Sequence, residues 1–367
     1  MIDLKRFFAG MAAALLAAVS FFPSQVSAVS ARSALVMDTT TGRVFYEKNA
    51  DDQSLIASTT KIMTALVVCE QCNVLDRMRI PKEAVGIEGS SLYLQEGEVL
   101  TIQELLYGMM LHSGNDAATA LAIYCGGTVE GFVQMMNDKA IRLGLQNTHF
   151  ANPHGLDAPG HYSTARDLAV LAANAMKNPI FAQTVSTKAI RIGNRSLQNH
   201  NKLLWQLPGA DGVKTGYTQA AGRILVSSAI RDGRRLVMVT IHDPNDWVDH
   251  KTMMEQTFSA YRMMPIVEKG ELVATRYVVG GQEEQVSLLA DADIDYPLAE
   301  GESLRLVIPG SGFVYAPVSA GQGAGVGYLC LGDQPVLKLP LVYGENIPCK
   351  TDPAPSLWQR LFGGIHA

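Results

Sequence analysis

Ser58-Thr59-Thr60-Lys61 and the apolar run that follows, 62–68 (IMTALVV), form the stretch that decides the fold. The run predicts a helix, and side chains three positions apart on a helix share one face. The Ser58 hydroxyl should therefore lie beside the Lys61 amine, at the positive end of the helix dipole. A buried lysine that has lost its proton can activate a serine nucleophile. Taken alone, however, S-x-x-K is better explained as a helix N-cap serine followed by a surface lysine.

Two further polar motifs follow in order, Ser113-Gly114-Asn115 and Lys214-Thr215-Gly216. Residues 101–104 (TIQE) fit a capping box that starts a helix, and a helical pattern resumes after the first of these two motifs. Ser113 and Asn115 are therefore expected in a short break between two helices, where their polar ends can point into a cleft. The alternative is an ordinary inter-helix turn, because serine, glycine and asparagine all favour turns.

The composition of the 367-residue chain suits an ordinary globular protein, with 47% hydrophobic and 18% charged residues. A chain of this length can bury one large apolar core and a smaller second one. The formal net charge of -5 gives no indication of nucleic-acid binding.

The first 28 residues have the features of a secretory signal peptide. Lys5 and Arg6 precede an apolar run, 7–22, which Pro23 ends, and Val26-Ser27-Ala28 offers a small-residue cleavage site. The alternative is an uncleaved membrane anchor, but the run is short for a span, which favours cleavage after Ala28 or slightly later. No other segment of the sequence is long and apolar enough to cross a bilayer. The mature chain is therefore expected to work outside the cytoplasm.

The chain has five cysteines, so at least one must be unpaired. Cys69 and Cys72 form a C-x-x-C at the end of the predicted helix, without a second pair or histidines at zinc-ligand spacing. We interpret this motif as structural or incidental, not as a metal or redox site. Cys330 and Cys349 could pair within a C-terminal domain, which the sequence leaves open.

The order of the predicted elements indicates an α+β fold, in which helices pack on an antiparallel sheet. Strands at 34–38 and 43–47 form a hairpin. A block of helices follows, and strands and a last helix complete the domain. The later elements are predicted as helices at 116–124, 128–143 and 164–176, strands at 188–192, 222–230 and 235–241, and a helix at 246–262.

After Met264 the pattern changes to short strands separated by glycine and proline turns, which indicates a small all-β domain. Its strands are predicted at 273–279, 284–289, 303–308, 313–318 and 336–342. The glycine-rich segment 321–327 resembles a phosphate loop only superficially, because no helix follows it. We therefore expect a flexible β-turn there.

The last residues, 356–367, carry an amphipathic pattern. Five apolar side chains fall on one helical face: Leu357, Trp358, Leu361, Phe362 and Ile365. This face resembles an interfacial anchor on the outer face of the membrane. The alternatives are a terminal helix docked on the β domain or a frayed tail, because two glycines weaken the helix. The expected limits are 1–28 for the signal peptide, 29–264 for the α+β domain, 265–350 for the β domain and 351–367 for the tail.

Five blocks of sequence carry a family resemblance. They are 56–64 (IASTTKIMT), 113–117 (SGNDA), 152–156 (NPHGL), 161–164 (HYST) and 211–218 (DGVKTGYT). Together they resemble the serine D-alanyl-D-alanine carboxypeptidases, the low-molecular-mass penicillin-binding proteins. S-x-x-K, S-D-N and K-T-G in this order are typical of these enzymes and of class A β-lactamases, and the second motif here is S-G-N. The resemblance covers nearly the whole chain and implies a penicillin-binding/β-lactamase-like domain followed by a small all-β domain.

The resemblance implies a two-step acyl transfer on a peptidoglycan stem peptide that ends in D-Ala-D-Ala. Ser58 would attack the carbonyl between the two D-alanines, and Lys61 would take its proton. Ser113 would relay a proton to the leaving D-alanine while Asn115 holds the geometry, and water would then hydrolyse the acyl-enzyme. β-Lactam antibiotics would be covalent inhibitors, and no metal or cofactor is required.

The third motif and its neighbours supply the substrate-binding residues that the resemblance implies: Lys214, Thr215, Gly216, Tyr217 and Thr218. Lys214 would provide positive charge for the terminal carboxylate and for the pKa of its neighbours. The two threonines would contact the carboxylate or the peptide backbone. The backbone N–H groups of Ser58 and Tyr217 would form the oxyanion hole, and such donors typically contribute ~3–4 kcal/mol to the transition state.

Two positions differ from some relatives, which carry an arginine that helps to bind the carboxylate. The segment 243–251 contains no arginine, and His200 also stands where some relatives have one. Carboxylate recognition should therefore depend more on Lys214 and Thr215. Three histidines are expected to be structural or rim residues, not catalytic bases: His154, His200 and His250.

Three other functions share parts of this pattern. A class A β-lactamase needs a glutamate for deacylation, and no Glu-x-x-x-Asn stretch lies between the second and third motifs. A non-catalytic wall-binding protein would not need the polar residues of the motifs. A D,D-endopeptidase that cuts cross-links would use the same residues, so the sequence leaves that alternative open.

Overall fold

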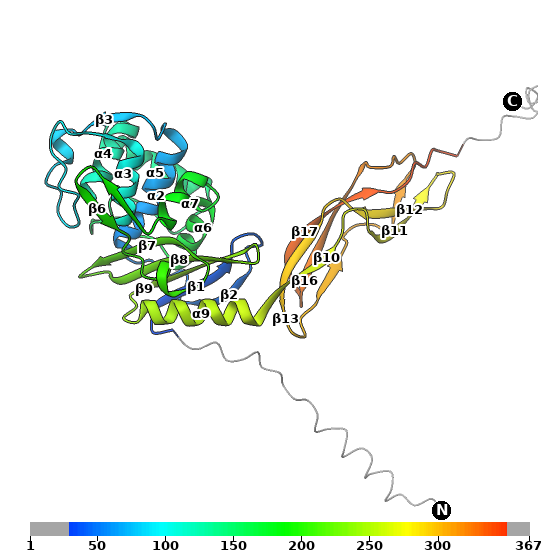
Figure 1. The fold of residues 1–367 in the computed structure, drawn as a ribbon. Helices are drawn as coiled ribbons and strands as arrows, with labels where there is room; N and C mark the ends of the chain where they lie inside the picture. The colour runs from blue at the N-terminus through cyan, green and yellow to red at the C-terminus, as the bar shows by residue number, and fades with distance from the viewer. Residues whose placement is uncertain (1–28, 351–367) are drawn as a thin grey trace, which may run out of the picture. The chain divides into compact units, whose positions relative to one another are not determined.

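The computed structural model describes residues 29–350, and the chain divides into two compact units between Phe258 and Ser259. The first unit is built on a five-stranded antiparallel sheet in the order β2-β1-β9-β8-β7 (Figure 1). Its strands are β1 (Ser33–Asp38), β2 (Val44–Lys48), β7 (Ala210–Thr218), β8 (Gly222–Arg231) and β9 (Arg234–Ile241). The predicted α+β arrangement is confirmed.

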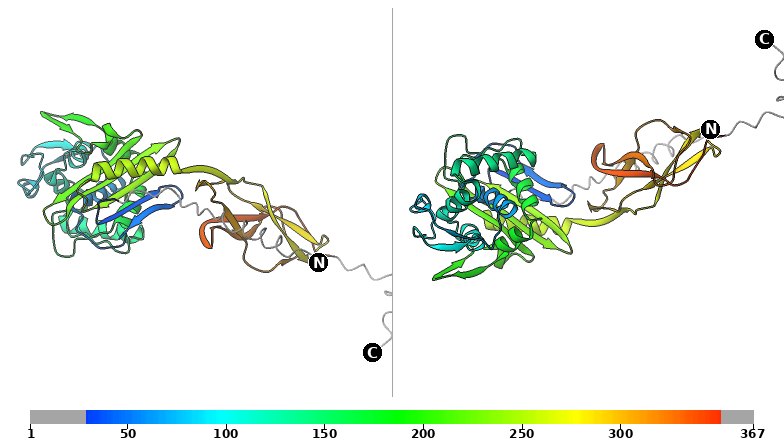
Figure 2. Two further views of the ribbon diagram at one scale, coloured as in Figure 1. Left: turned by 90° about the horizontal axis from the view of Figure 1, so that it is seen from below. Right: turned by 90° about the horizontal axis from the view of Figure 1, so that it is seen from above.

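Helices cover both faces of this sheet. On one face lies α9 (Asp246–Ala260), and a bundle of helices lies on the other, as the views in Figures 1 and 2 show. The bundle contains α2 (Lys61–Gln71), α3 (Ile102–Leu111), α4 (Asn115–Gly126), α5 (Val129–Arg142), α6 (Ala165–Ala175) and α7 (Pro179–Ser186). The shorter elements are η1 (Ala57–Thr60), β3 (Arg77–Arg79), η2 (Lys82–Ala84), β4 (Val99–Thr101), β5 (Ala189–Ile192), β6 (Arg195–Gln198) and α8 (Leu203–Gln206).

Strand β1 shows why the central strands are apolar on both sides. All six of its residues are buried. Leu35 belongs to the core on the bundle side, whereas Ala34 and Val36 belong to the core that includes α9. Successive side chains of a strand point to opposite faces, so a sheet covered on both faces needs apolar residues at consecutive positions.

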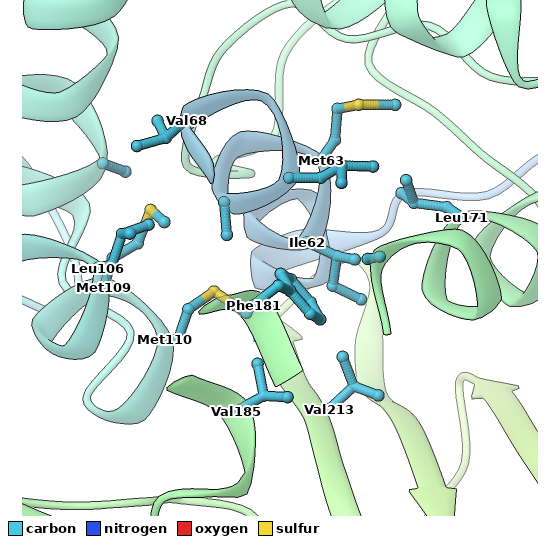
Figure 3. Close-up of a cluster of buried hydrophobic side chains, with 14 of the residues drawn as sticks. Ile62, Met63, Val68, Leu106, Met109, Met110, Leu171, Phe181, Val185 and Val213 are labelled. Atoms are coloured by element: carbon cyan, nitrogen blue, oxygen red, sulfur yellow. The ribbon is translucent and has the colours of Figure 1, made fainter. Parts of the chain in front are cut away.

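Helix α2 runs through the centre of the larger core. Each of its residues from Lys61 to Val68 is buried, and Figure 3 shows Ile62 and Met63 surrounded by side chains from other helices and from β7. A helix that is apolar all round must be enclosed by its neighbours. The helix therefore forms a rigid support for the residues at its start, which include Lys61.

The predicted helix starts at Thr101 and Thr164 and the predicted break are confirmed. Thr101 and Glu104 form a reciprocal capping box at the start of α3, and the Thr164 side chain caps α6. Helix α3 ends at Leu111, Ser113 has a positive φ of 65°, and α4 begins at Asn115. The second motif thus lies in a sharp turn between two buried helices.

His250 of α9 is buried between two hydroxyl groups. Its Nδ1 lies 2.6 Å from Ser227 Oγ, and its Nε2 lies 2.9 Å from Thr240 Oγ1. Burial lowers the pKa of His250 to about 3. The side chain is therefore neutral in the folded protein and has a structural role, as predicted.

We expect His250 to make the first unit less stable in acid. Between about pH 6.5 and about pH 4 the unfolded state binds a proton here that the folded state does not, so the free energy of unfolding falls as the pH falls, by roughly 3 kcal/mol for this group. His250→Gln should flatten that part of the pH dependence. Urea unfolding of the first unit at a series of pH values measures it, with the exposed His149→Gln as control. Parallel pH curves for wild type and His250→Gln would contradict the prediction.

The second unit is all-β, as predicted. Its sheets have the strand orders β10-β13 and β14-β16-β17-β12-β11-β15. The strands are β10 (Tyr261–Val267), β11 (Leu272–Val279), β12 (Gln285–Ala290), β13 (Ile294–Ala299), β14 (Leu304–Val307), β15 (Phe313–Tyr315), β16 (Gly323–Leu331) and β17 (Gln334–Tyr343).

Two details of the prediction were wrong, and one question that the sequence left open is answered. The segment 321–327 is not simply a flexible turn, because β16 begins at Gly323 and pairs with β17. A Cβ on Gly327 would come within 2.8 Å of Leu306 Cδ1, so close packing explains a glycine inside this strand. The last helix of the first unit ends at Ala260, where β10 follows directly. The sequence leaves the pairing of the two C-terminal cysteines open, and both are free: Cys330 is buried in β16 and Cys349 is exposed.

Within residues 29–350, no helix is long and apolar enough to span a membrane. In the same range, no group of three or more His, Cys, Asp or Glu side chains is arranged to hold a metal ion. The predicted signal peptide and the predicted amphipathic tail lie outside the described residues.

Candidate active site

The start of α2 brings Ser58 and Lys61 together as predicted, but the turn that holds them is not α-helical. Ser58 lies in the 3-10 turn η1 and does not cap the helix, which begins only at Lys61. Side chains three apart are eclipsed in a 3-10 turn. Lys61 Nζ accordingly lies 2.9 Å from Ser58 Oγ. The predicted pair is present, and a tighter turn than an α-helix holds it.

The Lys61 amine is fully buried and has three oxygen partners. Besides Ser58 Oγ, these are Asn115 Oδ1 at 2.7 Å and the His154 carbonyl oxygen at 2.6 Å. Burial lowers the pKa of Lys61 well below its usual 10.5, and the charge of Lys214 lowers it further, while Asp116 opposes the shift. The environment therefore favours the neutral amine.

Asn115 and Asp116 fix the second motif to the neighbouring segment 88–94. Asn115 Nδ2 donates to the Glu88 carbonyl at 2.5 Å, and the buried Asp116 carboxylate accepts the backbone N–H groups of Leu92 and Leu94. These bonds hold the amide oxygen of Asn115 toward Lys61. Nothing in the sequence of 88–94 indicates that it supports the site, because backbone groups make most of its contacts and only the Ser91 hydroxyl adds a side-chain bond to Asp116.

Ser113 lies in the same turn but does not join this network directly. Its side chain is buried. Among the described residues, no hydrogen bond links its hydroxyl to Ser58, Lys61 or Lys214. The structure therefore brings three of the predicted catalytic and supporting residues into contact, and places the fourth on the adjoining turn.

Strand β7 carries the third motif along the Ser58 turn. A Cβ on Gly216 would lie 3.3 Å from the Ser58 backbone nitrogen and 3.2 Å from the Ile56 carbonyl oxygen. These distances are tighter than ordinary van der Waals contact, so the absence of a side chain lets the strand pass close to the turn. The backbone of β7 is thereby placed beside the serine nitrogen, and Tyr217 next to it is largely exposed.

Lys214 is the second buried lysine of the site. Its Nζ donates to the carbonyl oxygen of Thr215 at 3.0 Å. Burial lowers the pKa of Lys214 to about 7. Thr218, at the end of β7, is engaged elsewhere, because its hydroxyl donates to Asp157 Oδ1 at 3.1 Å and accepts the Ala221 N–H.

The loop 152–156 closes the site from the side of α2. Its His154 carbonyl contacts Lys61, and its Pro153 carbonyl accepts Thr64 Oγ1 at 2.6 Å. Gly155 has a φ of 89°, and a Cβ there would overlap the Ala57 carbonyl. The sequence of this block resembles the family but does not reveal its role, because the group that contacts Lys61 is the His154 backbone carbonyl and not a side chain.

His200 lies near the site but is not a base for Ser58. Its ring packs against His112 with 5.1 Å between centroids. The residue is exposed, but partial desolvation of its ring, followed by the charge of Lys214, lowers the pKa of His200 to about 4. A neutral imidazole here adds no positive charge, which agrees with the prediction of a rim residue.

This geometry agrees with comparisons to known proteins. A family model described as D-alanyl-D-alanine carboxypeptidase matches residues 20–245. The chain belongs to the D-alanyl-D-alanine carboxypeptidase family. A second model, described as penicillin-binding protein 5, C-terminal domain, matches residues 261–348. The predicted family and the predicted class of serine-type carboxypeptidase are confirmed.

Relatives in both sequence and structure extend over most of the chain. D-alanyl-D-alanine carboxypeptidase DacF of Bacillus subtilis is 33% identical, with 86% of each chain covered. Penicillin binding protein 5 from Haemophilus influenzae superposes with a TM-score of 0.77 at 28% identity, covering 88% of this chain and 98% of that one. The Streptomyces K15 DD-transpeptidase is 36% identical with a TM-score of 0.62, covering 64% of this chain and 98% of its own.

Proposed function

We propose that Ser58 is the nucleophile of a D-Ala-D-Ala carboxypeptidase acting on peptidoglycan stem pentapeptides. The observation that carries this proposal is the set of partners around Lys61 Nζ. Two of them, the Asn115 and His154 oxygens, can only accept hydrogen bonds, whereas the Ser58 hydroxyl can also donate. A neutral amine has two N–H donors and one lone pair, so it fits these partners with its lone pair directed at Ser58.

In the first step, Ser58 Oγ attacks the carbonyl carbon between the two terminal D-alanines as its proton passes to Lys61. The tetrahedral oxyanion accepts hydrogen bonds from the backbone N–H groups of Ser58 and Tyr217. The close approach of β7 at Gly216 supports this oxyanion hole. Such donors act best when they are fixed before the reaction.

Collapse of the tetrahedral intermediate breaks the C–N bond and releases D-alanine. The leaving nitrogen takes a proton that Lys61 received, relayed by Ser113. Water then attacks the acyl-enzyme, with Lys61 again as the base, and Ser58 is regenerated. Lys214, when charged, attracts the carboxylate of the terminal D-alanine, and Thr215 contacts the carboxylate or the peptide backbone. Thr218 can do the same only when its hydroxyl exchanges the bond to Asp157 for one to the substrate.

Mass spectrometry of the purified protein with a stem pentapeptide tests this function. We expect the loss of one alanine, and no loss with Ser58→Ala. A cross-linked peptide dimer and an added amine acceptor distinguish related activities: splitting of the dimer indicates an endopeptidase, and addition of the acceptor indicates a transpeptidase. Alanine release that survives in Ser58→Ala would overturn the proposed nucleophile.

We further propose that the chain is exported and held at the outer face of the membrane by its tail. This rests on the sequence pattern of 1–28 and on the apolar face formed by Leu357, Trp358, Leu361, Phe362 and Ile365.

A chain truncated before Ser356 is expected to keep its turnover of soluble peptide and to lose binding to lipid vesicles, because only the anchoring surface is removed. Co-sedimentation with vesicles measures this. A full-length variant with Leu361 and Phe362 replaced by serine separates the apolar face from tail length and should also fail to bind. Equal vesicle binding by all three forms would refute the anchor.

A further inference from the structure

The ends of helices α2 and α4 bring together two cysteines that the acyl transfer does not use. Cys72 follows the last residue of α2, and Cys125 is the penultimate residue of α4. The two thiols lie close enough to influence each other's pKa. An adjacent bond fixes the same two segments, because the Tyr124 hydroxyl donates to Asp76 Oδ2 at 2.9 Å.

The two helices run side by side in the same direction. At their starts, Lys61 of α2 contacts Asn115 of α4 at 2.7 Å. The helices have 11 and 12 residues, so their ends fall at the same level, where the two thiols meet. Both cysteines pack against the same core. A covalent link at this end would fix the helices that carry the site at the other end.

We propose that Cys72 and Cys125 form a disulfide once the chain leaves the reducing cytoplasm. The oxidant is a disulfide compound that exchanges with protein thiols. The proposal rests on the proposed export only because export brings the chain into contact with this oxidant. One cysteine thiolate attacks this oxidant, a mixed disulfide forms and one thiol leaves. The second cysteine thiolate then attacks the protein sulfur of the mixed disulfide and releases the second thiol. In total, two protein thiols lose two protons and two electrons, and the oxidant becomes two thiols.

The surroundings of the three cysteines favour a disulfide between Cys72 and Cys125 over one between Cys69 and Cys72. The adjacent Cys72 thiol lowers the pKa of the Cys125 thiol, which makes Cys125 the first nucleophile. Burial, together with the neighbouring Cys72 and Glu70, raises the pKa of Cys69 to about 12, so Cys69 stays a thiol. Cys72 and Cys125 are partly exposed, as Cys69 is, so a reagent can reach them, and the contact between the helix ends decides which cysteine is the partner of Cys72.

Peptide mapping of the purified full-length protein tests the proposal. The folded protein is incubated with reduced or with oxidised glutathione and then digested without reduction. We expect one dominant linked peptide that joins Cys72 to Cys125, lighter by two hydrogens than the two peptides together. The oxidised form should also unfold at a temperature roughly 5–15 °C higher, because the link closes a long loop in the unfolded chain.

Variants identify the pair independently. Cys72→Ser and Cys125→Ser should each lose the oxidant-dependent rise in melting temperature, and Cys69→Ser should keep it. If one of the first two fails to fold, the other carries the same prediction. Linked peptides that contain Cys69, or a folded protein whose thiols only take up glutathione without linking, would overturn the proposal. The linked peptide and the melting temperature are measured without an activity assay. The disulfide can therefore be disproved while the proposed acyl transfer holds, and the acyl transfer can be disproved while the disulfide holds.

Discussion

Lys61→Arg is expected to lower the rate of acylation by roughly 10²–10⁴-fold, the range that a positioned general base contributes. Arginine keeps a positive charge but does not deprotonate in proteins. It therefore cannot accept the Ser58 proton, whatever contacts it makes with Asn115 and His154. The acylation rate is measured with a labelled penicillin and, in parallel, with a peptide that ends in D-Ala-D-Ala.

Lys214→Arg is the matched control for this experiment, because it makes the same chemical change at the second buried lysine of the site. We expect it to keep measurable turnover, with the loss expressed in kcat/KM. If Lys61→Arg acylates as fast as Lys214→Arg, then Lys61 is not the base. The proton path would then have to be redrawn through Ser113.

The pH dependence separates the two lysines in a second way. Lys214 has a pKa of about 7, so it loses its charge as the pH rises through that value. The attraction for the substrate carboxylate is present below this pH and is lost above it. We therefore expect kcat/KM for the peptide to fall about tenfold per pH unit well above pH 7, since this constant reports the ionisation of the free enzyme.

Lys214→Arg should remove this alkaline limb, because arginine remains charged throughout the range. The acid limb should remain in the variant, since it belongs to Lys61, which must be neutral to act as a base. Initial rates at low substrate concentration across the pH range give both limbs. An alkaline limb of unchanged midpoint in Lys214→Arg would show that another group controls it.

The fold class could be predicted because the information is local. Apolar runs, capping residues such as Thr101 and Thr164, and turn residues indicate helices and strands directly. The strand β16 was not predicted because the glycines within 323–327 have no side chains that could show an alternating pattern. At Gly327 a glycine is needed, since a Cβ there would be too close to Leu306. The turn at Ser58 was predicted as helix because the apolar run gives no sign that its first turn is tighter.

Only the part of the site that is formed by side chains could be predicted from the sequence. Ser58, Lys61 and Asn115 were expected together and lie together. The His154 carbonyl was not expected, since every residue has one and only the fold aims it. The same limit applies to the cysteines: the sequence shows Cys69 and Cys72 as a C-x-x-C, whereas only the fold brings the ends of α2 and α4, with Cys72 and Cys125, together.

The most direct test of the account is to locate the covalent bond. The protein is incubated with a labelled penicillin, digested, and analysed by tandem mass spectrometry, with Ser58→Ala and Ser113→Ala treated in the same way. We expect the label on Ser58, no label in Ser58→Ala, and slower labelling at the same residue in Ser113→Ala. Label on another residue, or label that persists in Ser58→Ala, would contradict it.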